Sequence, residues 1–399
     1  MNQVLIVDAL RTPRGRGNEK GSLKQANPAQ LLAQPLQALV AKHKLDTSWV
    51  VDGVFGCVTQ TGAQGTNIGK LALLQAGWSD KTSGTTLNRY CASGLSAVQF
   101  AAYQAIANDA LAIGGGIEMM SSVPMGSDRG ALMYDAAFQR QHELIAIGVA
   151  ADAIATLEEF SREACDAYAL TSQQRAAHAR DSGWFKSVVP VLNTNGSVLL
   201  ERDETPRPQT SAASLAGLQP AFEGLASQPD TQAILRDLLG SVQLRHVHHA
   251  GNSPAPADGA STVLLASATA ADRHGLRPRA RILSFADAAA HHTIALTGAV
   301  DATQRALEKS GLTTDDIDLF EVNESFASPM LHYMRHMKIN SDRLNVNGGA
   351  IALGHAMGST GSALIGIALD ELERRDAKRA VVAICGATGV AVATVIERV

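Results

Sequence analysis

The chain has few aromatic residues and few cysteines for its length. Phe, Trp and Tyr make up 4% of the 399 residues, whereas glycine occurs 35 times. A core of small aliphatic side chains with many glycine turns is typical of a large α/β protein. The four cysteines, Cys57, Cys91, Cys165 and Cys385, include no Cys-x-x-Cys pair. This pattern speaks against a zinc ribbon or a disulfide framework, and we expect reduced thiols and a cytoplasmic location.

The sequence also lacks a strong excess of either charge. Lys and Arg number 34 and Asp and Glu number 38, which gives a formal net charge of −4. We therefore expect no nucleic-acid partner and no attachment to a membrane surface. Strand-like sequence begins at residue 4, so no signal peptide is expected. The apolar run 380–396 is rich in Val, Gly and Thr, and it predicts two buried strands joined by a tight turn rather than a membrane-inserted helix.

Short β-branched runs alternate along the chain with longer segments of helical periodicity. This alternation predicts an α/β protein in which helices connect parallel strands. The strands are expected at 4–10, 50–58, 110–120, 258–267, 279–287 and 316–324, and the helices at 28–43, 66–76, 91–107 and 298–310.

The two halves of the chain follow similar plans. The helix expected after Cys91 is followed by a glycine-ending strand at 111–116, and the helix expected after His355 is followed by a similar one at 381–389. This weak duplication predicts two similar α/β domains that pack face to face with the active site between them. We place the first domain at 1–120 plus 250–270, an inserted region of helices and loops at 121–249, and the second domain at 271–399.

Cys91 is the strongest candidate for a chemical role. It follows Asn-Arg-Tyr and precedes small residues, after which apolar positions recur at helical spacing up to Ile106. Unpaired N–H groups and the helix dipole at a helix N-terminus favour a thiolate. We therefore predict that Cys91 is a nucleophile, with an inert buried cysteine as the alternative.

Three further segments carry polar or ionisable side chains in glycine- or serine-rich settings. His355 lies between Gly and Ala ahead of another helical run, and Cys385 ends a β-branched run beside glycines. Asn323 and Glu324 are adjacent in a segment that ends Ser-Phe-Ala-Ser. Together with Cys91, these residues make a plausible set of nucleophile, base and acid.

These motifs resemble those of the thiolase family, and the resemblance runs over nearly the whole chain. Further matching segments are 4–16, 114–126, 161–179, 202–208 and 249–262. The resemblance implies a thiolase-like fold, in which two core domains form a layered αβαβα arrangement and an inserted loop domain covers coenzyme A. It implies CoA-dependent cleavage of 3-ketoacyl-CoA, or the reverse condensation, by a homodimer or homotetramer. Coenzyme A and acyl-CoA are then substrates, and no permanently bound cofactor is expected.

The resemblance also implies a role for each catalytic candidate. Cys91 carries the acyl group, and His355 deprotonates it and helps to bind a thioester oxyanion. Cys385 moves a proton to and from carbon or a thiol, which a cysteine pKa near about 8.5 permits. Asn323 holds a water in the oxyanion site, and Glu324 steadies that network.

Contacts to CoA and to a second oxyanion are implied for Asn252, Ser253 and Ala387, the last through its backbone N–H. The sequence departs from the family pattern near these positions. Ala356 follows the histidine where the family usually has Pro. Pro254 and Ala255 stand where many relatives have Ser-Gly, which leaves the family's serine contact to the pantetheine arm open.

Two functions other than that of a thiolase, and a metal site, are the alternatives. A decarboxylating ketoacyl synthase of similar fold would have a Cys-His-His or Cys-His-Asn site, and Cys385 with Asn323 favours the thiolase. A silent acyl-CoA or lipid-binding protein would normally lack a catalytic residue, and none is missing. His332 and His336 stand four apart on an expected helix, but no carboxylate or cysteine at ligand spacing accompanies them. No metal site is therefore expected.

Overall fold

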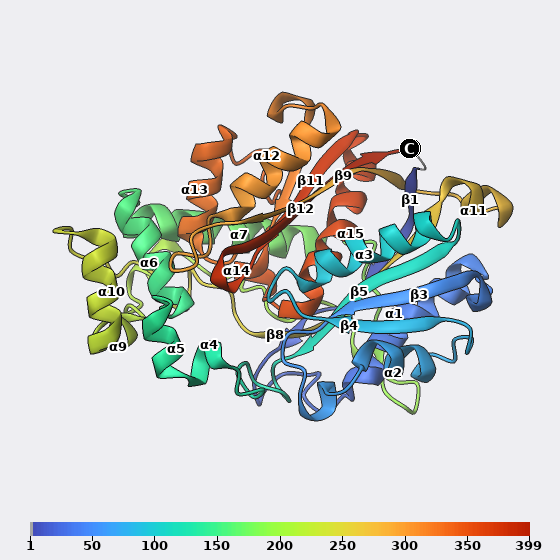
Figure 1. The fold of residues 1–399 in the computed structure, drawn as a ribbon, viewed down its shortest axis with the longest axis horizontal. Helices are drawn as coiled ribbons and strands as arrows, with labels where there is room; N and C mark the ends of the chain where they lie inside the picture. The colour runs from blue at the N-terminus through green and yellow to red at the C-terminus, as the bar shows by residue number, and fades with distance from the viewer. Residues whose placement is uncertain (1–2) are drawn as a thin grey trace.

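A ten-stranded mixed sheet runs through the molecule in a computed structural model that describes residues 3–399. Its order is β10-β11-β12-β9-β1-β8-β5-β3-β4, with the short β2 beside β8 (Figure 1). The strands are β1 Val4–Arg11, β2 Gly15–Arg16, β3 Val50–Gly56, β4 Ser83–Leu87, β5 Leu111–Met119, β8 Ala257–Ser267, β9 Ala280–Ala289, β10 Leu319–Val322, β11 Arg379–Cys385 and β12 Val390–Arg398. A separate two-stranded sheet contains β6 Val191–Leu192 and β7 Val198–Leu200.

Most helices of the core lie where the periodicity predicts them. The α-helices are α1 Pro28–His43, α2 Ile68–Gln75, α3 Ser93–Ala107, α4 Ala131–Tyr134, α5 Ala136–Gln141, α6 Ile147–Leu157, α7 Arg162–Asp181, α8 Ala212–Ala216, α9 Glu223–Ala226, α10 Pro229–Leu239, α11 Ala268–Arg273, α12 Gly298–Ser310, α13 Ala327–Met337, α14 Ala350–Leu353 and α15 Met357–Arg375. Helix α1 illustrates the local causes: Asn27 caps it by accepting from two backbone N–H groups, and Pro28 opens its first turn.

The two halves of the sheet repeat one topology. In the first half the spatial order is β4-β3-β5-β8-β1, so β1 lies at one edge of this half and β4 at the other. In the second half β10, β11, β12 and β9 follow the same order, and Leu344 adds a parallel bridge to Phe320 where the outer strand would lie. Helices α1, α2 and α3 thus correspond to α12, α13 and α15. The duplication inferred from the sequence pattern is confirmed at this level.

Helices α3 and α15 form the central layer of the fold. They pack against each other, and strands of both halves pack against them. One hydrophobic cluster joins Val98 and Ile365 of these helices to Ile6, Val263 and Val382 of the strands. Helices α1 and α2 cover the outer face of the first half, and α12 and α13 that of the second. Figure 1 shows the resulting αβαβα layers one above another, so the expected layered fold is confirmed.

The two halves are nevertheless joined into one sheet rather than forming separate sheets. Strands β1 and β9 pair antiparallel from Val4 opposite Ile282 to Ile6 opposite Ala280. The return of the chain through β8, between β1 and β5, agrees with the expected strand at 258–267. The expected domain boundaries remain a proposal, and residues 1–2 of the first domain lie outside the described residues.

The segment between β5 and β8 carries helices α4 to α10 and extends to one side of the layers (Figure 1). It has the mixture of helices and loops that its charge and proline content predict. Along the part of the chain that the structure describes, no helix has the length and apolarity needed to cross a membrane. The apolar run 380–396 forms β11 and β12, as predicted.

Candidate active site

Cys91 lies in a tight turn between β4 and α3. Ala92 is the N-cap of α3, so the thiol precedes the helix by two residues. Tyr90 has a φ of 49°, a left-handed conformation that is costly for a bulky side chain and is often found at functional sites. Its N–H donates to Asn88 Oδ1 at 2.8 Å, and Ser93 Oγ donates to its carbonyl at 2.6 Å. These two bonds hold the strained turn and fix the half-buried Cys91 at the start of the helix.

His355 is oriented by the first turn of α15. Its Nδ1 lies 2.9 Å from Thr360 Oγ1, and that hydroxyl donates to the Ala356 carbonyl at 2.9 Å. Because the hydroxyl has one hydrogen, it accepts from Nδ1–H and leaves the lone pair on Nε2. His355 is 9% exposed, and its Nε2 is buried without a protein partner among the described residues. This is the arrangement that a general base requires.

Glycines let the N-terminal turns of α3 and α15 meet. A Cβ at Gly94 would lie 2.7 Å from the carbonyl oxygen of Gly358, and one at Gly361 would lie 2.5 Å from the N of Leu95. Gly116, inside β5, also lies against Gly358: a Cβ at Gly116 would be 2.0 Å from the Gly358 carbonyl oxygen. The two helix starts that carry Cys91 and His355 are therefore brought together by close backbone packing.

Cys385 ends β11 beside the Asn323 segment. Its Sγ lies 3.5 Å from Ser325 Oγ and 3.5 Å from the carbonyl oxygen of Leu296. Asn323 Nδ2 donates to Ser325 Oγ at 3.2 Å, whereas its Oδ1 is buried without a protein partner in the part of the chain described. Ser325 was not singled out from the sequence, although it lies in the motif of Asn323 and Glu324. It links Asn323 to the thiol.

The loop after Cys385 lies against the Cys91 turn. A Cβ at Gly386 would be 3.1 Å from Tyr90 Cβ and 3.2 Å from the backbone N of Cys91. Within residues 3–399, neither the Cys91 N–H nor the Ala387 N–H donates to a backbone carbonyl of the surrounding turns and loops. Two backbone N–H donors on segments in contact are the kind of arrangement that an oxyanion site uses.

Electrostatics favour the neutral forms of the Cys91 thiol and the His355 imidazole. Burial, with Cys385 and Glu118 nearby, raises the pKa of Cys91 to about 12. Burial and the Arg14 guanidinium lower the pKa of His355 to about 3. The prediction that the helix N-terminus favours a Cys91 thiolate is therefore wrong for the free protein. Burial disfavours the thiolate, and the acidic neighbours of the thiol add to that effect. Burial likewise raises the pKa of Cys385.

Glu324 positions the loop that leads to His355. Its carboxylate accepts from Tyr168 OH at 3.0 Å, Ser172 Oγ at 2.7 Å and the N–H of Ile351 at 2.9 Å. These donors come from α7 and α14, so Glu324 ties the inserted region to the segment before His355. Burial raises the pKa of this carboxyl group.

Glu118 and Arg14 also support the site, and the sequence reasoning missed both. Glu118 is fully buried and accepts from the backbone N–H groups of Val58 at 2.9 Å, Thr59 at 3.1 Å and Gly358 at 2.9 Å. Arg14 donates to the Gly354 carbonyl at 2.8 Å. An acid near the end of a glycine-rich strand was the available signal for Glu118, but its partners lie 54 to 240 positions away in the chain.

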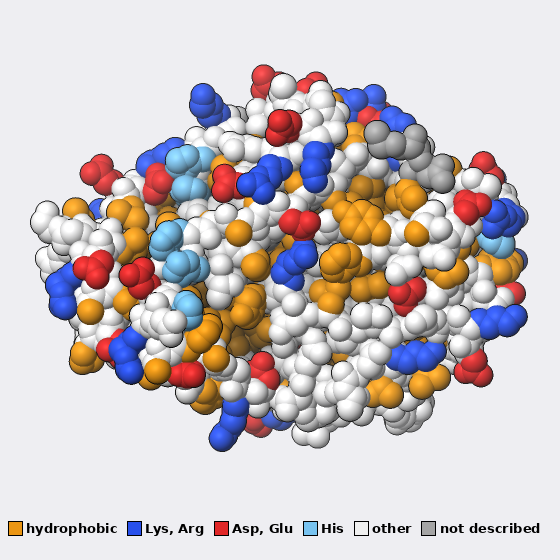
Figure 2. Space-filling view, in the orientation of Figure 1, with side chains coloured by type: hydrophobic (Ala, Val, Ile, Leu, Met, Phe, Trp, Pro, Cys, Tyr) orange, Lys and Arg blue, Asp and Glu red, His pale blue; other side chains and the backbone are white. Residues whose placement is uncertain are grey.

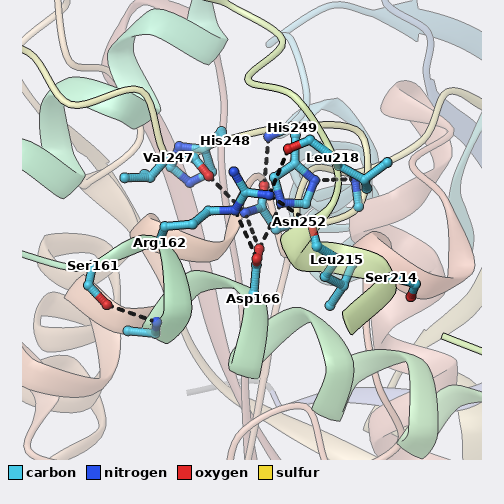
Figure 3. A network of polar contacts seen from close by, with 12 residues as sticks. Ser161, Arg162, Asp166, Ser214, Leu215, Leu218, Val247, His248, His249 and Asn252 are labelled. Atoms are coloured by element: carbon cyan, nitrogen blue, oxygen red, sulfur yellow. Dashed lines mark hydrogen bonds and ion pairs between the residues drawn. The ribbon is translucent and has the colours of Figure 1, made fainter. Parts of the chain in front are cut away.

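The two residues implied for CoA contact differ in their surroundings. Figure 3 shows Asn252 inside a polar network around Asp166, which accepts from Asn252 Nδ2 at 2.8 Å, Arg162 Nε at 2.8 Å and His249 Nε2 at 2.7 Å. Asn252 Oδ1 in turn accepts from the His249 N–H at 2.9 Å. Ser253 Oγ, in contrast, is buried with no protein partner among the described residues. A polar contact to a ligand is thus open to Ser253, whereas the Asn252 side chain is engaged within the protein.

Two protein-family models match this chain, one in its N-terminal part and one in its C-terminal part. Residues 4–229 match the thiolase N-terminal domain, and residues 276–398 match the thiolase C-terminal domain.

Similar proteins cover the full length. The chain is 37% identical over 421 residues to beta-ketoadipyl-CoA thiolase of Pseudomonas aeruginosa, covering 100% of this chain and 99% of that protein. It is 36% identical over 427 residues to the 3-oxoadipyl-CoA/3-oxo-5,6-dehydrosuberyl-CoA thiolase of Escherichia coli, and 36% identical over 410 residues to the 3-ketoacyl-CoA thiolase of Serratia proteamaculans, with 100% of both chains covered in each case. The chain therefore belongs to the thiolase family and is an acyltransferase.

Proposed function

We propose that Cys91, His355 and Cys385 carry the CoA-dependent thiolytic cleavage of 3-ketoacyl-CoA that this enzyme catalyses. The observation that supports the assignment most directly is the contact between two segments: the loop after Cys385 lies against the backbone N of Cys91. The unpartnered Nε2 of His355 supplies the base at the neighbouring helix start.

The first half of the reaction forms an acyl-enzyme. His355 Nε2 takes the proton of Cys91 as the sulfur attacks the 3-keto carbon of the substrate. The bond between C2 and C3 then breaks, and its electron pair leaves on C2 of the acetyl-CoA portion. Cys385 donates its thiol proton to that carbon. Acetyl-CoA departs, and the shortened acyl group remains on Cys91 as a thioester.

The second half returns every proton to its origin. The Cys385 thiolate takes the thiol proton of an incoming CoA, and the CoA sulfur attacks the thioester on Cys91. The shortened acyl-CoA leaves, and the Cys91 sulfur regains its proton from His355. Ser325, at 3.5 Å from Cys385 Sγ, stabilises the thiolate form of Cys385 by its hydrogen bond.

Hydrogen-bond donors stabilise the oxyanions of both halves. The N–H groups of Cys91 and Ala387 donate hydrogen bonds to the oxygen of the 3-keto group, and later to the oxygen of the Cys91 thioester. His355 and a water held by Asn323 Oδ1 donate hydrogen bonds to the thioester oxygen of the acetyl-CoA portion. Negative charge collects on this oxygen as the bond between C2 and C3 breaks.

Recognition of CoA is assigned to the inserted region and its junction with β8. The proposed first core domain is 1–120 plus 250–270, the proposed loop domain is 121–249, and the proposed second core domain is 271–399. Ser253 and the neighbouring Asn252 segment are proposed to contact CoA, with Ser253 Oγ as the available polar group. A role in fatty-acid β-oxidation, a cytoplasmic location and a homo-oligomeric state belong to the same proposal.

The names of the relatives suggest two kinds of acyl group to compare. Some act on 3-oxoadipyl-CoA, whose acyl chain ends in a carboxylate, and others on 3-ketoacyl-CoA. Thiolysis rates with acetoacetyl-CoA, longer 3-ketoacyl-CoA and 3-oxoadipyl-CoA would establish which the enzyme prefers.

The assignment of residues is tested with acetyl-CoA and mass spectrometry of the digested protein. Wild type and Cys385→Ser should both carry the acetyl group on Cys91, because acylation by acetyl-CoA needs no proton transfer to carbon. Cys91→Ala should carry none. Cys165→Ala, which changes a cysteine of α7 outside the site, is the matched control and should behave as wild type.

Steady-state thiolysis on the same preparations separates the two cysteines. Cys385→Ser should lose about a hundredfold or more, the usual cost of losing a general acid or base. An acetyl group only on Cys385 would reverse the assignment. Near-normal thiolysis by Cys385→Ser would remove Cys385 from the mechanism and favour a ketoacyl-synthase type of site.

A further inference from the structure

Away from the active site, one carboxylate and two histidines point their ligand atoms at a common position. Glu158 Oε1 lies 2.8 Å from His332 Nδ1 and 2.9 Å from His336 Nε2. The three ligand atoms all lie within 4.8 Å of one another. The sequence placed the histidines four apart on a helix but offered no carboxylate. The fold supplies it from the C-terminal end of α6, 174 positions away from His332.

We propose that Glu158, His332 and His336 form a binding site for a divalent transition-metal ion of the zinc type. Two imidazole nitrogens and one carboxylate oxygen are a ligand set that zinc accepts in tetrahedral sites, with water in the fourth position. Calcium and magnesium prefer oxygen ligands throughout and do not fit two histidines. The set therefore selects among zinc, copper, nickel and cobalt rather than the hard cations.

Both histidines can present a lone pair at this position. His332 and His336 lie one turn apart on α13, with ring centroids 4.1 Å apart, so their nitrogens reach the same side of the helix. In the metal-free network each ring donates an N–H to the same Glu158 oxygen. A metal ion replaces those two hydrogens as the link, and each neutral ring shifts its proton to the opposite nitrogen.

The surroundings allow an ion to enter. His336 is 45% exposed, whereas His332 and Glu158 are 13% and 19% exposed. Figure 2 shows histidine side chains gathered at the surface over α13. An ion would thus reach the site from solvent and meet two partly buried ligands that packing already holds in place.

Arg335 tunes the site from its outer side. Its Nη1 donates to Glu158 Oε2 at 2.7 Å and to the Glu158 carbonyl at 2.8 Å, and its guanidinium lies over the Phe160 ring at 4.2 Å. The arginine fixes the carboxylate with Oε1 toward the histidines, as outer partners of metal ligands do. Its positive charge also weakens binding of a cation, so the site is expected to bind reversibly.

A bound ion would clamp the inserted region to the second half of the fold. Glu158 follows α6, which belongs to the inserted region, whereas α13 directly follows the segment of Asn323 and Ser325. Metal binding should therefore raise the temperature of unfolding without being needed for thiolysis. This inference does not depend on the proposed reaction mechanism.

The test is titration of the metal-free protein with ZnCl2 by calorimetry, together with the absorption spectrum of added Co²⁺. His336→Ala and His332→Ala should each weaken binding at least about tenfold, the lower end of what even outer-shell changes cost. The matched control is His292→Ala, which alters an exposed histidine stacked on His291. It should bind as wild type does.

Two further readouts keep the proposal open to refutation. Zinc should raise the unfolding temperature of wild type and of His292→Ala but not of the double variant His332→Ala/His336→Ala. The Co²⁺ spectrum of wild type should lack cysteine-to-metal charge transfer, because no cysteine is among the three ligands. Equal affinity in wild type and the double variant, or a Co²⁺ spectrum dominated by cysteine-to-metal charge transfer, would overturn the proposal.

Discussion

His355 combines a base's free lone pair with a buried position that disfavours its charged form. The ring is held by Thr360 through Nδ1, and Nε2 has no protein partner among the described residues. Arg14 adds a positive charge nearby, so a proton on the ring is disfavoured twice. The site without substrate therefore favours a thiol and a neutral imidazole.

Because native His355 resists protonation, the stability of the fold depends on pH. The native pKa of His355 is lowered to about 3, whereas an unfolded histidine titrates near about 6.5. Below about pH 6.5 the unfolded chain therefore binds a proton that the native chain does not, and stability falls as the pH falls.

We expect the difference in unfolding free energy between wild type and His355→Asn to shrink by about 2 kcal/mol from pH 6.5 to pH 5, since each pH unit is about 1.4 kcal/mol. Urea unfolding of both proteins at the two pH values measures it. A constant difference would mean that His355 titrates in the native protein as it does in the unfolded chain. His142→Asn, an exposed position, should show no such change relative to wild type.

Glu118 is a positioning residue whose role the fold alone reveals. It joins the loop after β3 to the first turn of α15 through backbone N–H groups, and Gln64 Nε2 donates to it at 2.9 Å. Four donors facing one carboxylate leave no acceptor for an amide NH2.

Glu118→Gln should therefore lower kcat by at least about tenfold with little change in KM, because the His355 turn shifts while CoA contacts remain. It should also lower the unfolding temperature, as a buried donor left without a partner costs about 1–3 kcal/mol. Steady-state kinetics and thermal unfolding measure both effects. The control is Glu143→Gln, an exposed glutamate. Loss of stability with unchanged kcat would make Glu118 merely structural.

At the scale of elements, the active site depends on how closely α15 approaches β5 and α3. The backbone of β5 contacts the backbone of α15 directly, so no side chain larger than hydrogen fits at Gly116. Cys91 and His355, the proposed nucleophile and base, are therefore positioned by the packing of whole helices as well as by their own turns.

Gly116→Ala tests this contact. Its Cβ would lie 2.0 Å from the Gly358 oxygen, so α15 must move, at a cost of about 1–3 kcal/mol for overpacking. We expect a lower unfolding temperature and a fall in kcat larger than the fall in stability explains. Gly224→Ala in α9, where the Cβ meets no atom within 4 Å, should keep full activity. Equal kcat in the two variants would show that α15 tolerates the shift.

At the scale of the whole molecule, the surface around β4 is where we expect the proposed homo-oligomer to form. Strand β4 is the outermost strand of its half of the sheet. Beside it α2 exposes Leu71 and Leu74, and α3 exposes Phe100 and Tyr103. Figure 2 shows hydrophobic side chains gathered over α3. An open strand edge next to apolar side chains suits pairing with a second copy across a two-fold axis.

Sedimentation at micromolar concentration should therefore give a dimer or tetramer of the 41.8 kDa chain. Leu74→Glu combined with Phe100→Glu should shift the protein toward monomer, because two buried charges would oppose association. Val242→Glu, which also changes an exposed apolar residue, lies outside this surface and should leave the mass unchanged. A wild-type monomer would refute the homo-oligomer.

The sequence by itself determined the elements and the family. Periodicity placed α1 and α12 at their observed bounds, and β-branched runs placed β1, β8, β11 and β12 nearly so, because these signals are local to a few turns or strand residues. It also singled out Cys91, His355, Cys385, Asn323 and Glu324, since each lies in a short motif that the family shares.

Only the tertiary structure decided which groups share an environment. The pKa of Cys91 is raised by burial and by Cys385 and Glu118, which lie far from it in the chain. Glu158 reaches His332 and His336 across 174 or more positions, so no spacing rule could reveal it. The pairing of β1 with β9 likewise joins distant segments. Local patterns fix what each segment becomes, whereas desolvation, charge and close backbone approach depend on neighbours that only folding supplies.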